Sequence, residues 1–306
     1  MTQRKQKKNN EKNENQNDLT YEKMLKAHFQ KCSKEKEKNK SLNLSERRLV
    51  NLPIRAALKS KGVIDWWRMV SDLDLSGNKL DSHSIPTEFQ ELKSLRSLEL
   101  HHNNFHEIPR VVLSLDQLRF LGFSNNQLSV IPNDIQKMSQ LYGLSLANNK
   151  LGSIAPLCRV RTLRWLSLDS NLITQIPRLI KNMKLLECLY LRHNKIRSIP
   201  QELNKCKELH ELCLSYNQIT EIKNGVFVFN SLKILDLSGN PIQSLPQEIQ
   251  NLKLDFLAIE DCLLTSKPNN LSSLTIIDDQ NPYLSLLDLT QSEIDFDPQK
   301  VEWKEF

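Results

Sequence analysis

One short pattern of apolar residues and Asn occurs eight times between Val70 and Ile242. Each copy has an apolar residue, any two residues, Leu, any residue, Leu or Phe, any two residues, Asn, any residue and an apolar residue. Successive Asn residues are 25, 23, 23, 22, 23, 23 and 23 positions apart, a period that predicts stacked structural repeats. The repeated Asn residues are Asn78, Asn103, Asn126, Asn149, Asn171, Asn194, Asn217 and Asn240.

Two weaker copies extend the array, one around residues 42–49 and one around residues 254–264. Arg47 and Cys262 stand in these copies where the others have Asn. The sequence therefore predicts about ten repeats within residues 41–265.

The two Leu residues inside each copy are one residue apart, which is the period of a β-strand. Both Leu side chains then point to one face, and the residues beside them point to the other. A single short strand cannot bury its apolar face, so we expect the repeats to stack as a parallel sheet with strands ~4.8 Å apart.

The Asn of each copy has a predicted structural role. Its amide can pair with backbone groups of the turn after the strand, and each such group would cost about 1–3 kcal/mol if buried without a partner. In most copies Ile-Pro or Leu-Pro follows the Asn. Pro has no backbone N–H to donate to a β-sheet, so a new segment begins there. Apolar residues at three-residue spacing, as in Phe89, Leu92 and Leu95, predict short helical or 3₁₀ turns there. The predicted fold class is an α/β solenoid with a concave parallel sheet.

These motifs closely resemble the leucine-rich-repeat family, which implies a horseshoe that binds other proteins. The 23-residue form with Ile-Pro is similar to intracellular scaffolds such as the Ras-associated and phosphatase-regulating leucine-rich-repeat proteins. The resemblance covers about three quarters of the chain, residues 41–265. It implies a scaffold or adaptor, with a small GTPase among the possible partners, and leaves the partner's identity open.

Three regions are predicted. Residues 1–40 form a basic tail, disordered to about residue 17 and followed by a possible capping helix; residues 41–265 form the solenoid; residues 266–306 form a cap and an acidic tail. Residues 1–40 hold twelve Lys or Arg against six acids, and residues 278–306 hold eight acids against two Lys. The basic cluster at residues 4–8 could be a nuclear address or contact nucleic acid, but a solvated tail is the favoured interpretation.

Six Cys residues are scattered through the chain without the clustered spacing of extracellular disulfide caps. No apolar run is long enough to span a membrane, and the first residues do not resemble a secretion signal. We therefore expect a protein without a membrane span, located in the cytoplasm, with the nucleus as an alternative.

The outward residues of the strands are the candidate partner-binding site. Large apolar groups are unusual on a solvent-facing sheet, and aromatic anchors dominate binding energy at protein interfaces. Asp74 and Glu99 predict an acidic end of the concave face, while Arg192, with His193 and Lys195, predicts a basic patch further along. The predicted contact residues are Phe120, Trp165, Tyr190, Arg192, Tyr216, Phe256, Asp74 and Glu99.

Catalysis is not favoured. Asp74 and Glu99 should lie on adjacent strands, but nothing nearby suggests a substrate cleft, so a solvated acidic patch is the preferred interpretation. His101 and His193 lie four predicted strands apart, too far to share a metal ion. With no phosphate-binding loop or nucleophile motif, we expect neither a cofactor nor a metal.

Two short motifs near the carboxyl end suggest alternative functions. Lys300, Val301 and Trp303 match the docking pattern of protein phosphatase 1 ligands, which would make the chain a targeting subunit of that enzyme. The stretch around Leu286 and Ile294 resembles the segment after the repeats in substrate receptors of cullin–elongin ubiquitin ligases, although Thr290 replaces the expected Cys. A helix capping the last strand is the favoured alternative for this stretch.

Overall fold

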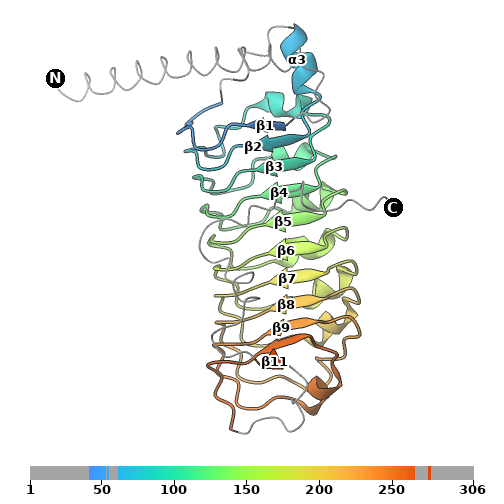
Figure 1. Cartoon of the computed structure of the whole chain (residues 1–306). Coiled ribbons are helices and arrows are strands. Elements are labelled where there is room, and N and C mark those ends of the chain that lie inside the picture. Colours follow the sequence, from blue (N-terminus) through green and yellow to red (C-terminus); the bar gives the residue numbers. More distant parts are fainter. Residues whose placement is uncertain (1–40, 53, 55–60, 266–274, 277–306) are drawn as a thin grey trace, which may run out of the picture.

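A computed structural model describes residues 41–52, 54, 61–265 and 275–276. Its strands form a single parallel sheet in which each strand pairs with its neighbours in the sequence (Figure 1). The central Leu residues are in register, so that Leu121 of one strand faces Leu144 of the next. The strands are β1 (Ser41–Asn43), β2 (Asp72–Asp74), β3 (Ser97–Glu99), β4 (Phe120–Gly122), β5 (Gly143–Ser145), β6 (Trp165–Ser167), β7 (Cys188–Tyr190), β8 (Glu211–Cys213), β9 (Ile234–Asp236), β10 (Phe256–Ala258) and β11 (Thr275–Ile276).

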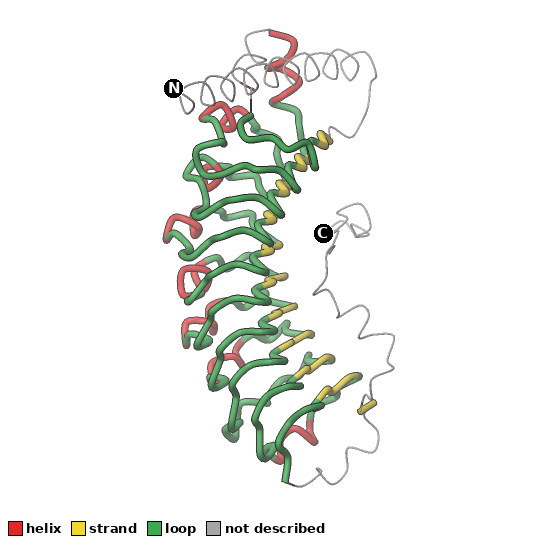
Figure 2. The backbone as a smooth tube through the Cα atoms, turned by 90° about the vertical axis from the view of Figure 1, so that its left-hand side faces the viewer, coloured by secondary structure: helices red, strands yellow, loops and turns green. Residues whose placement is uncertain are grey.

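Short 3₁₀ helices cover the opposite side, and the stack curves with the strands on its concave face (Figure 2). Pro precedes five of them with φ between −76° and −68°, which is why the Ile-Pro motif marks the start of the convex segment. The predicted solenoid with a concave parallel sheet is confirmed. The 3₁₀ helices are η1 (Thr87–Glu91), η2 (Val112–Ser114), η3 (Asn133–Lys137), η4 (Ala155–Arg159), η5 (Arg178–Asn182), η6 (Gln201–Lys205) and η7 (Gln247–Asn251).

The Asn side chains connect neighbouring repeats. Asn149 is buried, and its Oδ1 accepts the backbone N–H of Leu128 at 2.9 Å. Its Nδ2 donates to the carbonyl oxygens of Phe123, in the preceding repeat, at 2.9 Å and of Leu146, in its own repeat, at 3.1 Å. The same pattern recurs at the other repeats, so each Asn satisfies backbone groups that lie deep in the stack.

The repeats at the two ends of the array lack the Asn, and each end has its own hydrogen bonds in its place. Cys262 takes part of the Asn role, because its Sγ lies 3.4 Å from the carbonyl oxygen of Leu237. At the other end, Asn78 accepts the backbone N–H of Arg47 at 3.1 Å. The sheet continues past the expected limit at residue 265, because β11 pairs with β10.

The segment between β1 and β2 is longer than the segments between the other strands and contains the helix α3 (Lys61–Trp67). Trp66 and Trp67 are buried in the core, and the Trp67 ring meets the Phe89 ring edge to face with centroids 5.8 Å apart. The predicted capping helix before residue 40 lies outside the described residues, and so does the predicted cap and acidic tail at residues 266–306 except for residues 275–276.

One charged cluster is buried between repeats. An Arg192 Nη2 atom lies 3.5 Å from Asp236 Oδ2, and both side chains are less than a tenth exposed. The backbone N–H of Arg192 donates to Asp169 Oδ1 at 2.7 Å. Burial raises the pKa of Asp169 to about 6, although the hydrogen bond from Arg192 opposes that shift.

Replacement of Asn149 by Ala should destabilise the array. The change leaves the buried N–H of Leu128 without its acceptor and removes one of the two amide donors to the carbonyl of Phe123, so we expect a loss of about 2–4 kcal/mol in the free energy of unfolding. Urea unfolding followed by tryptophan fluorescence measures it. Asn104→Ala is the control, because Asn104 is exposed and should change stability by less than ~0.5 kcal/mol; equal losses in both variants would contradict the proposed role.

Asp169 should make stability depend on pH. Its pKa is higher in the folded chain than in the unfolded chain, so the folded state binds the proton first and this group adds stability as the pH falls from about 7 towards 5. Relative to Asp169→Asn, the wild type should gain on the order of 1 kcal/mol between pH 7.5 and pH 5. Urea unfolding of both proteins at the two pH values tests this, and a difference that stays constant with pH would refute it.

Candidate functional site

The outward strand residues form aligned columns on the concave face. Phe120 pairs in register with Gly143, and Gly143 with Trp165. A second column places Asp74 beside Glu99, and Glu99 beside Gly122, on adjacent strands as the spacing predicted. Residues 23 positions apart are therefore neighbours in space.

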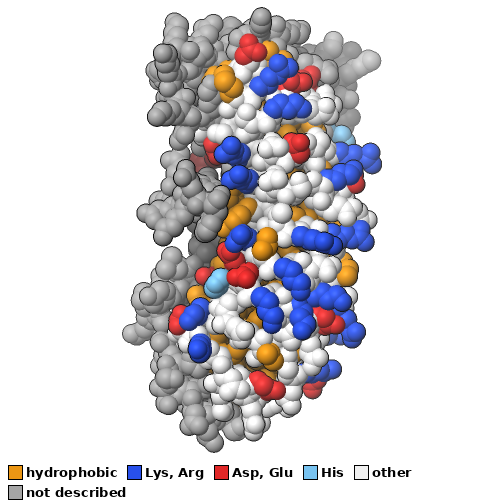
Figure 3. Space-filling model, turned by 90° about the vertical axis from the view of Figure 1, so that its right-hand side faces the viewer, with side chains coloured by type: hydrophobic (Ala, Val, Ile, Leu, Met, Phe, Trp, Pro, Cys, Tyr) orange, Lys and Arg blue, Asp and Glu red, His pale blue; other side chains and the backbone are white. Residues whose placement is uncertain are grey.

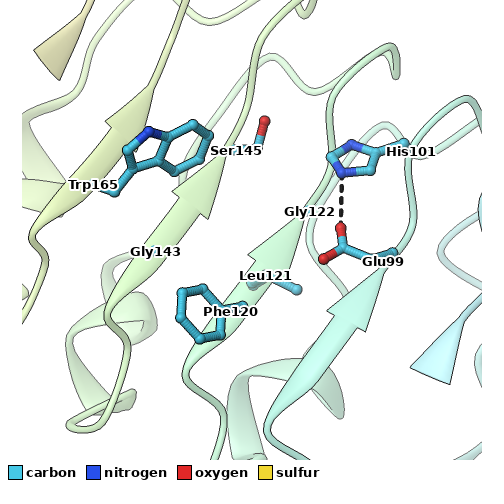
Figure 4. Close-up of a pocket in the computed structure, with 8 residues that line it drawn as sticks. All are labelled: Glu99, His101, Phe120, Leu121, Gly122, Gly143, Ser145 and Trp165. Atoms are coloured by element: carbon cyan, nitrogen blue, oxygen red, sulfur yellow. Dashed lines mark ion pairs between the residues drawn. The ribbon is translucent and has the colours of Figure 1, made fainter. Parts of the chain in front are cut away.

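A shallow recess lies across β3 to β6. Gly143 forms its floor: a Cβ atom at this position would lie 2.7 Å from Phe120 Cδ1 and 3.8 Å from Trp165 Cε3. Trp165 and the Glu99–His101 pair lie at opposite ends of the recess, with Phe120 between them (Figure 4). The recess is open and has a free volume of about 20 Å³. Its lining residues are Glu99, His101, Phe120, Leu121, Gly122, Gly143, Ser145 and Trp165.

Aromatic rings surround this recess. The Phe120 and Tyr142 ring centroids are 5.4 Å apart, and those of Trp165 and Tyr190 are 6.0 Å apart. Both distances are typical of favourable aromatic pairs, which hold the rings in fixed orientations. The Arg164 guanidinium carbon lies 5.7 Å from the centroid of the Tyr142 ring. The same guanidinium pairs with Glu187, so a charged pair lies beside these aromatic rings.

The acidic end of the recess has its own hydrogen bonds. Glu99 Oε2 lies 2.7 Å from His101 Nε2, and the backbone N–H of Ser124 donates to His101 Nδ1 at 2.9 Å. Because Nδ1 accepts a hydrogen bond, the ring proton belongs on Nε2, which donates to Glu99. Both ring nitrogens are thus engaged. Asp74 is similarly occupied, accepting from Asn43 Nδ2 at 3.0 Å.

Arg192 departs from the expected basic patch. Its side chain is only 8% exposed and pairs with Asp236, because the neighbouring repeats supply carboxylates around it. Of the two basic neighbours, His193 is exposed and stacks on Tyr216 with centroids 4.6 Å apart, and Lys195 is exposed.

The other predicted contact residues differ in exposure. Tyr190 is partly buried and its hydroxyl donates to Glu211. Tyr216 is 50% exposed and has φ of +53°, so it lies on the turn after the strand rather than on the strand. Phe256 is 5% exposed and packs against Cys213 and Ala258.

Three features of the recess were not predicted. Gly122 and Gly143 leave room that side chains of adjacent strands fill, and the signal for this was the presence of Gly at two outward strand positions in a chain with only seven Gly. Tyr142, which precedes the outward strand position, was not predicted.

Within the described ranges, no group of three His, Cys, Asp or Glu side chains comes close enough to hold a metal.

Comparisons with known proteins agree with this geometry. Leucine-rich-repeat family profiles match residues 70–92, 117–138, 161–219 and 207–264. A search of curated proteins gave no significant match. No helix in the described part of the chain is long and apolar enough to cross a membrane.

Several solved structures are similar. A leucine-rich-repeat protein of Leptospira interrogans is 29% identical with a TM-score of 0.70, and the match covers 78% of this chain and 60% of that one. The plant peptide hormone receptor RGFR1, in complex with RGF2, is 31% identical over 65% of this chain and 37% of the receptor, with a TM-score of 0.54. An internalin of Listeria monocytogenes shares the fold at 20% identity and a TM-score of 0.58, over 86% of this chain and 95% of its own.

The chain thus spans about three fifths of the first of these proteins and little more than a third of the second. The aligned strands, the hydrogen-bonded Asn residues and the profile matches all describe the same architecture. This chain carries leucine-rich repeats and folds as a leucine-rich-repeat solenoid.

Proposed function

We propose that this protein is a non-enzymatic interaction scaffold that binds a partner protein on its concave face, centred on β3 to β6. The observation that carries the proposal is the recess above Gly143, where the partly exposed Trp165 presents aromatic surface on a sheet face and Phe120, only 5% exposed, packs over the Gly143 backbone. Aromatic residues around a small pocket are typical centres of binding energy at protein interfaces.

The dimensions of the recess favour a protein partner over a small molecule. A volume of about 20 Å³ is far below the several hundred Å³ of typical cofactor or substrate pockets. A partner can place one apolar side chain above Gly143 while its neighbouring residues contact the adjacent columns. The plant receptor complex with RGF2 supports the idea that a related array serves a polypeptide ligand.

The occupied acid and His groups support a non-enzymatic role. His101 uses one nitrogen for Ser124 and the other for Glu99, so a substrate would have to break one of these bonds before His101 could act as a base. The expected solvated acidic patch is then a charged end of the interface. It would favour partners that place basic residues near β2 and β3.

The finer alternatives remain predictions. Lys300, Val301 and Trp303 of the phosphatase motif, and Leu286 of the ligase motif, lie outside the described residues. A cytoplasmic or nuclear location belongs to the same proposal and rests on the Cys spacing.

Removal of the aromatic anchors should abolish partner binding. In affinity purification with the tagged full chain, Phe120→Ala plus Trp165→Ala should lose partners that the wild type retains, with a loss of about 2 kcal/mol or more, roughly thirtyfold in affinity. Val130→Ala is the control, because Val130 is 67% exposed and lies away from the recess. If mass spectrometry finds the same partners with both variants, the concave face is not the binding surface.

Filling the recess from its floor provides a second test. In Gly143→Ala the new methyl group would meet the Phe120 ring at 2.7 Å, so the ring must shift and narrow the recess, while both aromatic residues remain. We expect partner affinity to fall by about tenfold. Binding to a recovered partner is measured by calorimetry, and circular dichroism checks the fold. Unchanged affinity in a folded variant would show that no side chain enters above Gly143.

A further inference from the structure

A second surface lies on the flank of the solenoid where the 3₁₀ helices end and the strands begin. Three adjacent repeats each place two cations there, at or just after the ends of η4, η5 and η6, and all six side chains are exposed. Figure 3 shows Lys and Arg side chains gathered over the middle of this side of the molecule. This basic flank consists of Arg159, Arg161, Lys181, Lys184, Lys205 and Lys207.

The basic flank differs from its surroundings, because the described residues supply no carboxylate partner to its cations. Among the described residues, none of its six cations lies within 4.0 Å of an acid, whereas in the preceding repeat Lys137 pairs with Asp134 at 3.1 Å. Lys184 Nζ instead donates to the carbonyl oxygen of Lys205 at 3.3 Å. Glu208 is exposed beside Lys207 and offsets only one of the six charges.

Such an arrangement favours an anionic ligand. The contacts between η4, η5 and η6 bring the cations of consecutive repeats together, and like charges at such distances repel. An acidic segment laid along the flank would replace this repulsion with attraction, because one ligand would neutralise charges from three repeats.

The chain itself contains a complementary segment. Residues 278–306 hold eight acids and two Lys, a net charge of −6, and lie outside the described part of the chain. They follow β11 directly, and a segment of this length reaches up to ~100 Å when extended, farther than the five repeats between β11 and η6–η4 at ~5 Å each. A tethered segment acts at an effective concentration of order millimolar, so it has an advantage over an external anion.

We propose that the basic flank is the docking surface for the acidic segment 278–306 of the same chain. This contact lies on a different face from the recess and does not depend on the proposed partner binding. It would hold the carboxyl-terminal segment against the middle of the solenoid. Salt would weaken it, since the cations are exposed and screened charges attract over shorter distances.

The test is carbodiimide coupling of the full-length protein, which joins an amine to a carboxylate in direct contact. Mass spectrometry should find links from Lys181, Lys184, Lys205 and Lys207 to acids of residues 278–306, and these links should disappear in high salt. Lys150 and Lys195, exposed on the opposite edge of the strands, are internal controls and should give few links to that segment. A mixture of isotope-labelled and unlabelled protein separates links within one chain from links between chains.

A variant that keeps every reactive Lys makes the test specific. Arg159→Glu plus Arg161→Glu should reduce the yield of these links by about tenfold, because it turns two attractive charges into repulsive ones. Lys150→Glu plus Lys195→Glu, which reverses the same number of charges elsewhere, should leave the yield unchanged.

Three results would overturn the proposal: links shared equally with Lys150 and Lys195, links only between chains, or a yield that the Arg variant does not change. If links are absent and that variant instead loses binding to phosphatidylserine vesicles or to polyuridylate RNA, the flank serves a membrane or a nucleic acid and not the acidic segment.

Discussion

The hydrogen bonds of the repeated Asn amide hold the rest of this structure in place. Each one spans two repeats, accepting a backbone N–H of the preceding repeat and donating to carbonyls of both. These backbone groups lie in turns that are too deep for water and too irregular for the sheet ladder. The turn just before each Asn adopts a left-handed conformation even at Tyr216 and His193, which have positive φ. The array accepts that strain because the Asn pairing closes every turn in the same geometry.

This constraint fixes the register and therefore creates the functional surfaces. With the central Leu residues aligned, any outward residue lies beside its equivalents in the neighbouring repeats. Small residues then act as spacing elements. Gly143 gives the Phe120 ring its place, and Gly122 does the same for the Glu99–His101 pair. The flank follows the same rule, because one cation pair repeated three times produces a continuous basic surface.

The two surfaces suit different kinds of ligand. The concave recess offers aromatic surface and polar groups that already have partners. A ligand binds there through a complementary shape and the exclusion of water. The basic flank offers exposed positive charge. A ligand of opposite charge is attracted to it over a long range. Since they lie on different faces of one rigid stack, a ligand on one surface leaves the other accessible.

The sequence alone determined the repeat, the strand face, the concave parallel sheet and the Asn positions, because periods of 2 and about 23 residues leave only one way to bury the Leu side chains. It also placed Phe120 and Trp165 at equivalent strand positions, and their part in binding stays a prediction. Only the tertiary structure decided that Arg192 is buried beside Asp236, that His101 is committed to Glu99 and Ser124, and that β11 extends the sheet. These outcomes depend on contacts between side chains of different repeats, and a repeat pattern specifies which residues become neighbours but not how their side chains share the space between them.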